Sequence, residues 1–202
     1  MDGDILKIQK KVGVNADFFE KLREEDDWSF IIKLHALLES VCTSLLIFHL
    51  NEPEIKKFVS RLELSNTNTG KVALLKQLHL LGEYERRFVR ELSTLRNSIV
   101  HDVKNSKFEL KEFYADLNCT DLKRHAISFS PFEFFIVELE KKDKDFKIKN
   151  APTVKDMIQR MLSDPKEYIW YGAHAVLIHI SEMFHYSDYL QWKKAKRLLQ
   201  DE

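Results

Sequence analysis

Hydrophobic residues recur every three or four positions along most of the chain, the spacing typical of amphipathic helices. The most regular stripe predicts a helix from about residue 83 to residue 101 with one face in the core. Its members are Leu81, Tyr84, Phe88, Leu92, Leu95 and Ile99. A second segment, residues 28–50, is apolar over more than half of its helical circumference. Such width predicts burial on two sides, as for the central helix of a bundle.

Weaker stripes predict further helices at residues 17–23, 52–62, 71–81, 107–114 and 153–162, and from residue 164 to the end of the chain. Residues 5–14 are mixed in character and predict no clear element before Gly13 ends them. Aromatic and β-branched residues gather at 126–140, where we expect a short β-hairpin or an irregular aromatic insertion.

The predicted fold class is therefore all-α, an antiparallel helical bundle. With only five Gly and four Pro in 202 residues, the composition agrees with it. We expect one domain over 1–202. Its bundle core would span 26–117, an insertion or loop 118–151, and helices at 152–202 would pack on the bundle.

Charge and cysteine usage limit the environment and the partners. Lys plus Arg and Asp plus Glu both number 32, so no global field attracts nucleic acid, and any RNA contact must be a local patch. The basic residues at 193–197 lie near the C-terminus of the last helix. We interpret them primarily as a complement to the negative end of that helix's dipole, and only secondarily as a patch that guides RNA. Cys42 and Cys119 lack metal spacing, the N-terminus lacks a secretory signal, and the apolar runs are short. We expect a soluble, cytoplasmic protein without membrane contact.

Metal and cofactor sites find little support in the sequence. Glu182 and His185 form one E-x-x-H, but a carboxylate-bridged dinuclear centre needs a second copy and two more Glu. His174 and His179 lie in an apolar helix, where core histidines are commoner than ligands. No glycine-rich phosphate loop is present. We expect neither a metal nor a cofactor.

The candidate chemistry lies at the end of the 83–101 helix. Arg96 and His101 are off the apolar stripe, about 140° apart around the axis and about 7.5 Å along it, so one polar groove could hold both. That side also carries small, basic and β-branched residues, which suit a close contact between helices with an anion site at its edge. They are Gly82, Arg86, Val89, Arg90, Ser93, Asn97 and Val100.

The segment from Arg96 to His101 reads R-N-S-I-V-H and resembles the R-x4-6-H signature of HEPN domains, most often R-N-x-x-x-H. The match is complete over the motif and extends loosely to residues 28–117, while the last third shows no family signature. The resemblance implies a helical bundle that dimerises. In many members, Arg and His from two protomers form a metal-independent ribonuclease site.

Each residue of the motif then has an expected role. His101 would act as acid or base on RNA, and Arg96 would hold the scissile phosphate with its planar guanidinium. Asn97 would hydrogen-bond backbone or His101, or merely cap the helix end. Arg86 and Arg90 would hold flanking phosphates, or be ordinary surface charge.

His35 and Glu39, four residues apart, could form a pair near this cleft, although an exposed pair on one helix is the favoured interpretation.

Two functional hypotheses follow. The first is a homodimeric HEPN-type endoribonuclease, a toxin or defence effector with a neutralising protein partner, which would cut RNA by 2′-hydroxyl attack. The second is a non-catalytic HEPN-like module that dimerises or binds a protein partner. Near-neutral charge favours the second hypothesis, and the intact Arg96 and His101 favour the first.

Overall fold

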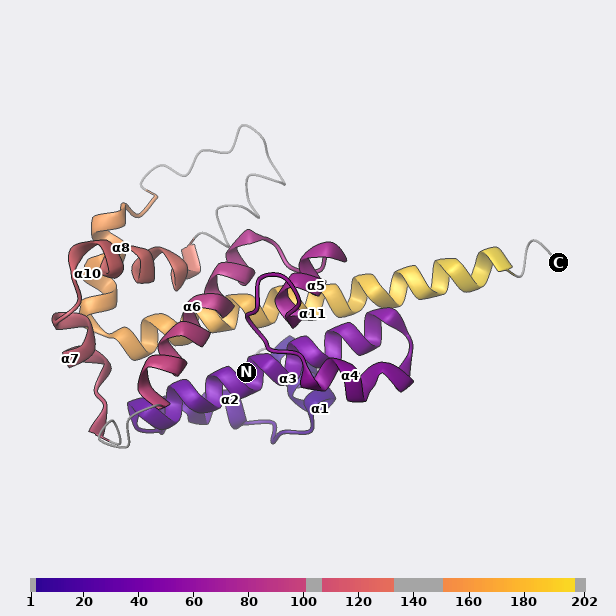
Figure 1. Ribbon diagram of the computed structural model, residues 1–202, viewed down its shortest axis with the longest axis horizontal. Coiled ribbons are helices and arrows are strands. Elements are labelled where there is room, and N and C mark those ends of the chain that lie inside the picture. Colours follow the sequence, from indigo (N-terminus) through magenta and orange to yellow (C-terminus); the bar gives the residue numbers. More distant parts are fainter. Residues whose placement is uncertain (1–2, 101–106, 133–150, 199–202) are drawn as a thin grey trace.

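The computed structural model describes residues 3–100, 107–132 and 151–198, and all the regular structure within these ranges is helical (Figure 1). The predicted all-α bundle is confirmed. The α-helices are α1 (Gly3–Val12), α2 (Phe18–Lys21), α3 (Asp27–Leu50), α4 (Lys56–Arg61), α5 (Lys71–Gln77), α6 (Glu83–Val100), α7 (Leu110–Ala115), α8 (Cys119–Ser128), α10 (Val154–Ser163) and α11 (Pro165–Leu198), with short 3-10 turns at Leu22–Glu24 and Pro53–Ile55.

Helix α3 is the centre of the bundle and packs against α1, α4, α5, α6 and α11. It begins after Asp26, whose carboxylate accepts a hydrogen bond from the Ser29 amide at 2.9 Å. It ends at Asn51, which has φ 54°, a left-handed conformation that Asn tolerates better than most residues. Its length and composition would suffice to cross a membrane, but half of the relevant window is buried inside the protein, as in the core helix of a bundle.

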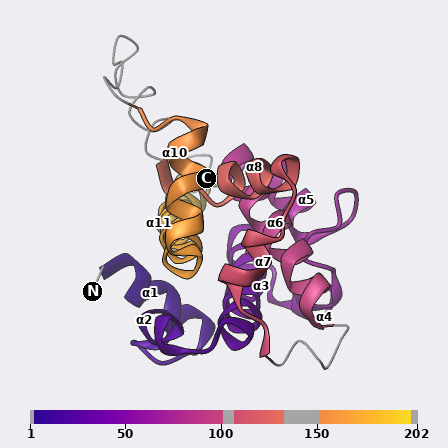
Figure 2. The ribbon, with the colours of Figure 1, turned by 90° about the vertical axis from the view of Figure 1, so that its left-hand side faces the viewer.

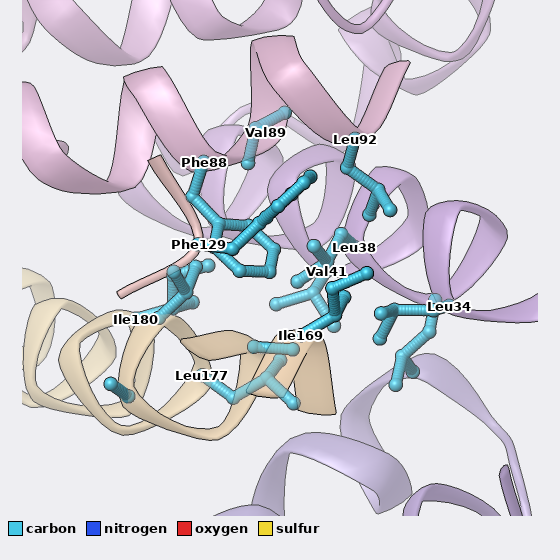
Figure 3. Packing of buried hydrophobic residues seen from close by; sticks show 14 of the residues in the cluster. Leu34, Leu38, Val41, Phe88, Val89, Leu92, Phe129, Ile169, Leu177 and Ile180 are labelled. Carbon is cyan, nitrogen blue, oxygen red and sulfur yellow. The ribbon is translucent and has the colours of Figure 1, made fainter. Parts of the chain in front are cut away.

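Helices α6 and α11 complete the core with α3. Figure 3 shows Phe88, Val89 and Leu92 of α6 facing Leu34, Leu38 and Val41 of α3, above Ile169, Leu177 and Ile180 of α11. All nine side chains are buried, and they belong to one continuous cluster that extends from α1 to α11.

Gly172 marks the closest approach in this core. A Cβ at this position would lie 2.4 Å from the Phe129 carbonyl oxygen and 2.7 Å from the Phe88 ring. Glycine therefore lets α11 pack directly on α6 and the end of α8, and the Gly172 carbonyl accepts a hydrogen bond from the Tyr84 hydroxyl at 3.2 Å.

Two segments differ from the sequence-based expectation. Residues 119–128 form α8 rather than a loop, and Ala126 and Phe129 are buried core residues, so the first part of the expected hairpin is wrong. The remainder of that hairpin, 133–140, lies outside the described residues. Residues 3–12 form α1, which buries Ile5 and Ile8 against α3 and α11; Figure 2 shows α1 and α2 together, away from α5 and α8.

Candidate functional site

A polar groove of about 330 Å³ lies where the C-terminal half of α6 meets α3 and the loop after α4. Ser93, Arg96 and Asn97 line it from α6, because residues three and four apart share one face of a helix. His35 and Glu39 line it from α3, again four residues apart. Glu63 and Ser65 line it from the loop after α4. The groove thus gathers one cation, one imidazole, two carboxylates and three neutral polar groups from three segments of the chain.

Arg96 is half-buried in this groove. One guanidinium nitrogen, Nη1, donates a hydrogen bond to Asn97 Oδ1 at 3.0 Å, and no carboxylate within the described ranges forms an ion pair with it. A guanidinium carries five N–H donors, so most of its hydrogen-bonding capacity remains for a ligand. Asn97 therefore contacts Arg96, a bond that the sequence did not predict. The expected bond from Asn97 to His101 involves a residue outside the described ranges.

His35 lines the groove from α3 and contacts α6. Its Nε2 lies 3.0 Å from the Ser93 hydroxyl oxygen, and that hydroxyl donates its single proton to the Val89 carbonyl at 2.9 Å. Ser93 can then only accept from His35, which assigns the imidazole proton to Nε2 and a lone pair to Nδ1. Among the described residues none hydrogen-bonds to Nδ1, and the atom is not buried, so it is open to solvent.

The pKa of His35 is lowered from its ordinary value of 6.5. Burial of the imidazole is the largest cause. The Glu39 carboxylate, the next largest influence, raises the pKa, and the charges of Arg96 and Lys71 lower it. At neutral pH this imidazole is therefore uncharged and able to accept a proton.

Glu39 has a different partner from the one considered in the sequence. Its Oε1 lies 2.6 Å from Nζ of Lys71, which is almost completely buried at the start of α5. The interpretation of His35 and Glu39 as an exposed pair is wrong, because His35 bonds to Ser93 and Glu39 to Lys71 although both line one groove. Sequence reasoning placed Ser93 on this side of the helix but gave it no partner, and it missed Lys71, since nothing in the local pattern of Lys71 distinguishes it from other helix positions.

Arg86 and Arg90 lie outside the groove lining, on the same side of α6 as Asn97. Their Nε atoms donate to α6's own backbone, Arg86 to Gly82 O at 2.8 Å and Arg90 to Arg86 O at 3.1 Å. Arg90 is exposed and Arg86 is half-buried. His101 follows Val100, the last residue of α6, and lies outside the described residues.

Two histidines of α11, His174 and His179, pack among core and ion-pairing groups, whereas His185 is exposed. The His174 ring lies 5.5 Å from that of Trp170, and His179 Nδ1 is 3.7 Å from the buried Glu85 carboxylate. Within the described ranges, no three metal-binding side chains cluster.

Cys42 is also buried, and burial raises the pKa of its thiol to about 12. This residue is therefore no candidate for a nucleophile.

Comparison with known protein families, with curated proteins and with solved structures finds no match to this chain. The groove therefore has to be interpreted from its own residues and from the motif at the end of α6.

Proposed function

We propose that the protein is a metal-independent endoribonuclease of the HEPN type. The observation that supports it best is the environment of Arg96, the arginine of the R-N-x-x-x-H motif, which lies in a groove open to solvent and, among the described residues, donates a side-chain hydrogen bond to Asn97 alone. A cation that is held on a helix with no ion-pair partner in that part of the chain suits a phosphate ligand.

The chemistry requires three contributions. A base removes the proton of the ribose 2′-hydroxyl, the O2′ atom attacks phosphorus, and an acid protonates the departing 5′-oxygen, which leaves a 2′,3′-cyclic phosphate. Arg96 would stabilise the charge on the phosphoryl oxygens. The motif gives His101 an acid or base role in this scheme.

Arg86 and Arg90 would extend the phosphate contacts along α6 towards its N-terminus. Their alignment with Asn97 supports this role, because successive phosphates of one strand can follow one face of a helix. Arg90→Ala should weaken RNA binding modestly. It should also reduce the slope of the logarithm of the binding constant against the logarithm of the salt concentration by about one. Filter-binding titrations between low and moderate salt measure this slope, and an unchanged slope would leave Arg90 as ordinary surface charge.

Assembly and context follow from the resemblance. A homodimer through the motif-helix face would bring two Arg96–His101 pairs together. A toxin or defence effector of this kind would act in the cytoplasm and need a neutralising protein partner.

An RNA cleavage assay with chelator tests the proposal. The purified chain should cut RNA with chelator present, and Arg96→Ala and His101→Ala should each lose about 10²–10³-fold or more of that activity. Arg160→Ala removes the same charge from α10, and His185→Ala removes an exposed imidazole from α11. Both controls should cut as the wild type does. RNA that stays intact under every condition would refute the nuclease.

A second candidate, a non-catalytic module that binds a protein, is favoured by the end of α11. This helix continues beyond the rest of the bundle (Figure 1), and Tyr186, Tyr189 and Trp192 expose about half of their side chains there, at 45%, 52% and 58%. Exposed aromatic side chains gathered on one helix are common at protein interfaces. Intact RNA in the assay above, together with loss of oligomerisation or partner binding in Trp192→Ala, would support this candidate.

A further inference from the structure

The motif alone supplies one imidazole, whereas cleavage needs a proton acceptor and a proton donor at once. We infer that His35 is a second catalytic residue of this site and acts as the general base through Nδ1, in the same chain as Arg96. The inference rests on the proposed nuclease function. It concerns a residue sixty positions before the motif, outside the R-x4-6-H pattern.

The hydrogen bonds around His35 give the ring the form that a base needs. The Val89 carbonyl uses the Ser93 proton at 2.9 Å, so Ser93 accepts from Nε2 at 3.0 Å and the lone pair is left on Nδ1. The backbone of α6 therefore determines the tautomer, as a carboxylate or carbonyl does for other catalytic histidines.

The neighbours of His35 agree with this role. Arg96 lines the same groove and acts electrostatically on the imidazole, so a phosphate held by Arg96 would lie beside it. Glu39 also faces the ring, but Lys71 neutralises it at 2.6 Å. Glu63 lies at the groove's outer edge and hydrogen-bonds Asn66 at 3.5 Å. Burial keeps the ring uncharged at neutral pH, ready to accept a proton.

The proposed step balances with a water molecule as the proton donor. Nδ1 of His35 takes the proton of the 2′-hydroxyl while the O2′–P bond forms. The P–O5′ bond breaks, and the 5′-oxygen takes a proton from a water molecule. The hydroxide that remains takes the proton from His35, which restores both.

The chain offers a matched control for this residue. His49 also lies on α3 and is half-buried, and its Nδ1 is 2.8 Å from the Ser187 hydroxyl, which donates to the Met183 carbonyl at 2.8 Å. Burial lowers the pKa of His49 as well. The arrangement repeats that of His35, but His49 does not line the groove of Arg96.

The test compares His35→Gln with His49→Gln in the chelator-resistant cleavage assay across pH. Glutamine can still donate to the serine but cannot take a proton, and we expect His35→Gln to lose about 10²–10⁴-fold in rate. The wild-type rate should fall with acid as His35 becomes protonated, below pH 6.5. That acidic limb should be absent from the residual activity of His35→Gln, while His49→Gln should match the wild type in rate and limb.

Other outcomes separate the failures. If His35→Gln cleaved RNA at the wild-type rate, His35 would not be the general base. A lower rate that still fell with acid would lead to the same conclusion. In both cases the proposed nuclease function would be unaffected. Absence of cleavage by the wild type would overturn both. A mixture of His35→Gln and Arg96→Ala chains should cleave no faster than the two alone. Restored cleavage in the mixture would overturn the same-chain assignment.

Discussion

Two faces of α6 carry the same three residue types with opposite consequences. On one face, Arg96 meets His35 and Glu39 in a groove open to solvent. On the other, the buried pair Glu91 and His125 is joined by Arg124 of α8, whose side chain is half exposed; we call these three residues the buried cluster. An arginine, a histidine and a glutamate are present in both places, so residue type alone does not distinguish a ligand site from a structural one.

The difference lies in how the hydrogen-bonding groups are paired. In the buried cluster, Glu91 Oε1 lies 2.9 Å from His125 Nε2 and Oε2 lies 3.2 Å from Arg124 Nε, while His125 Nδ1 meets the Tyr114 hydroxyl at 3.2 Å. Both imidazole nitrogens and both carboxylate oxygens have partners from α6, α7 and α8. In the groove, by contrast, the described residues leave several Arg96 donors and the His35 Nδ1 atom without a hydrogen-bond partner.

The largest expected effect is on stability, in the buried cluster. Glu91→Ala leaves the buried His125 without its carboxylate, while Arg124 keeps Asp121, and should lower the free energy of unfolding by about 3–5 kcal/mol. Urea denaturation measures this loss, with Glu112→Ala on the exposed face of α7 as the control that changes little. A Glu91→Ala protein as stable as the wild type would remove the distinction between the two clusters.

The next effect is on activity, in the groove. Arg96→Lys keeps the charge but loses the planar fork, and we expect cleavage to fall by at least about tenfold while the free energy of unfolding stays within about 0.5 kcal/mol. Arg96 has no ion pair among the described residues, so its replacement breaks none. Parallel cleavage and urea measurements test this, and a stability loss as large as that of Glu91→Ala would make Arg96 a structural residue.

Much of the fold was predictable because long helices repeat their apolar pattern many times. The prediction of α6 at 83–101 matches Glu83–Val100, and that of the central helix at 28–50 matches Asp27–Leu50. Helix α1 was missed because only Ile5 and Ile8 of its apolar residues are buried, too few for a clear stripe. Helix α8 was obscured by the aromatic residues that follow it.

The site was predictable only in part. Arg96 and Asn97 could be found from the motif, because it is local in sequence. The contact of His35 with Ser93 and that of Glu39 with Lys71 join segments 58 and 32 residues apart, and they exist only because α3 packs against both α5 and α6. The requirement for glycine at position 172 likewise has no local signal in the sequence. It arises because the backbone at the end of α8 leaves no room for a Cβ on Gly172.

A smaller effect is expected from the hydroxyl that completes the buried cluster. Tyr114→Phe leaves His125 Nδ1 without its partner in a buried site and should cost about 1–3 kcal/mol of stability. Tyr171→Phe, on the exposed surface of α11, is the matched control and should be neutral. Equal stability in both variants would show that the Tyr114 hydroxyl contributes nothing to the cluster.

The smallest effect separates the clusters by their response to acid. Burial opposes the charge of Glu91, but the hydrogen bond from His125 and the charges of His125 and Arg124 outweigh it, so its pKa is lowered from 4.5. A carboxyl group with a lower pKa in the folded state binds fewer protons than in the unfolded chain. It therefore contributes stability above pH 4.5 that is lost as pH falls through its folded pKa.

Urea midpoints from pH 7 down into the acid range should accordingly fall less steeply below pH 4.5 in Glu91→Gln than in the wild type. His35→Gln should change the slope from pH 6.5 downward. The lowered pKa of His35 instead contributes stability that is present above pH 6.5 and is lost as pH falls through its folded pKa. If Glu91→Gln and the wild type shared one slope below pH 4.5, the pairing of Glu91 with His125 would not hold in solution. The buried cluster would then no longer differ from the open groove in having its charged groups paired within the chain.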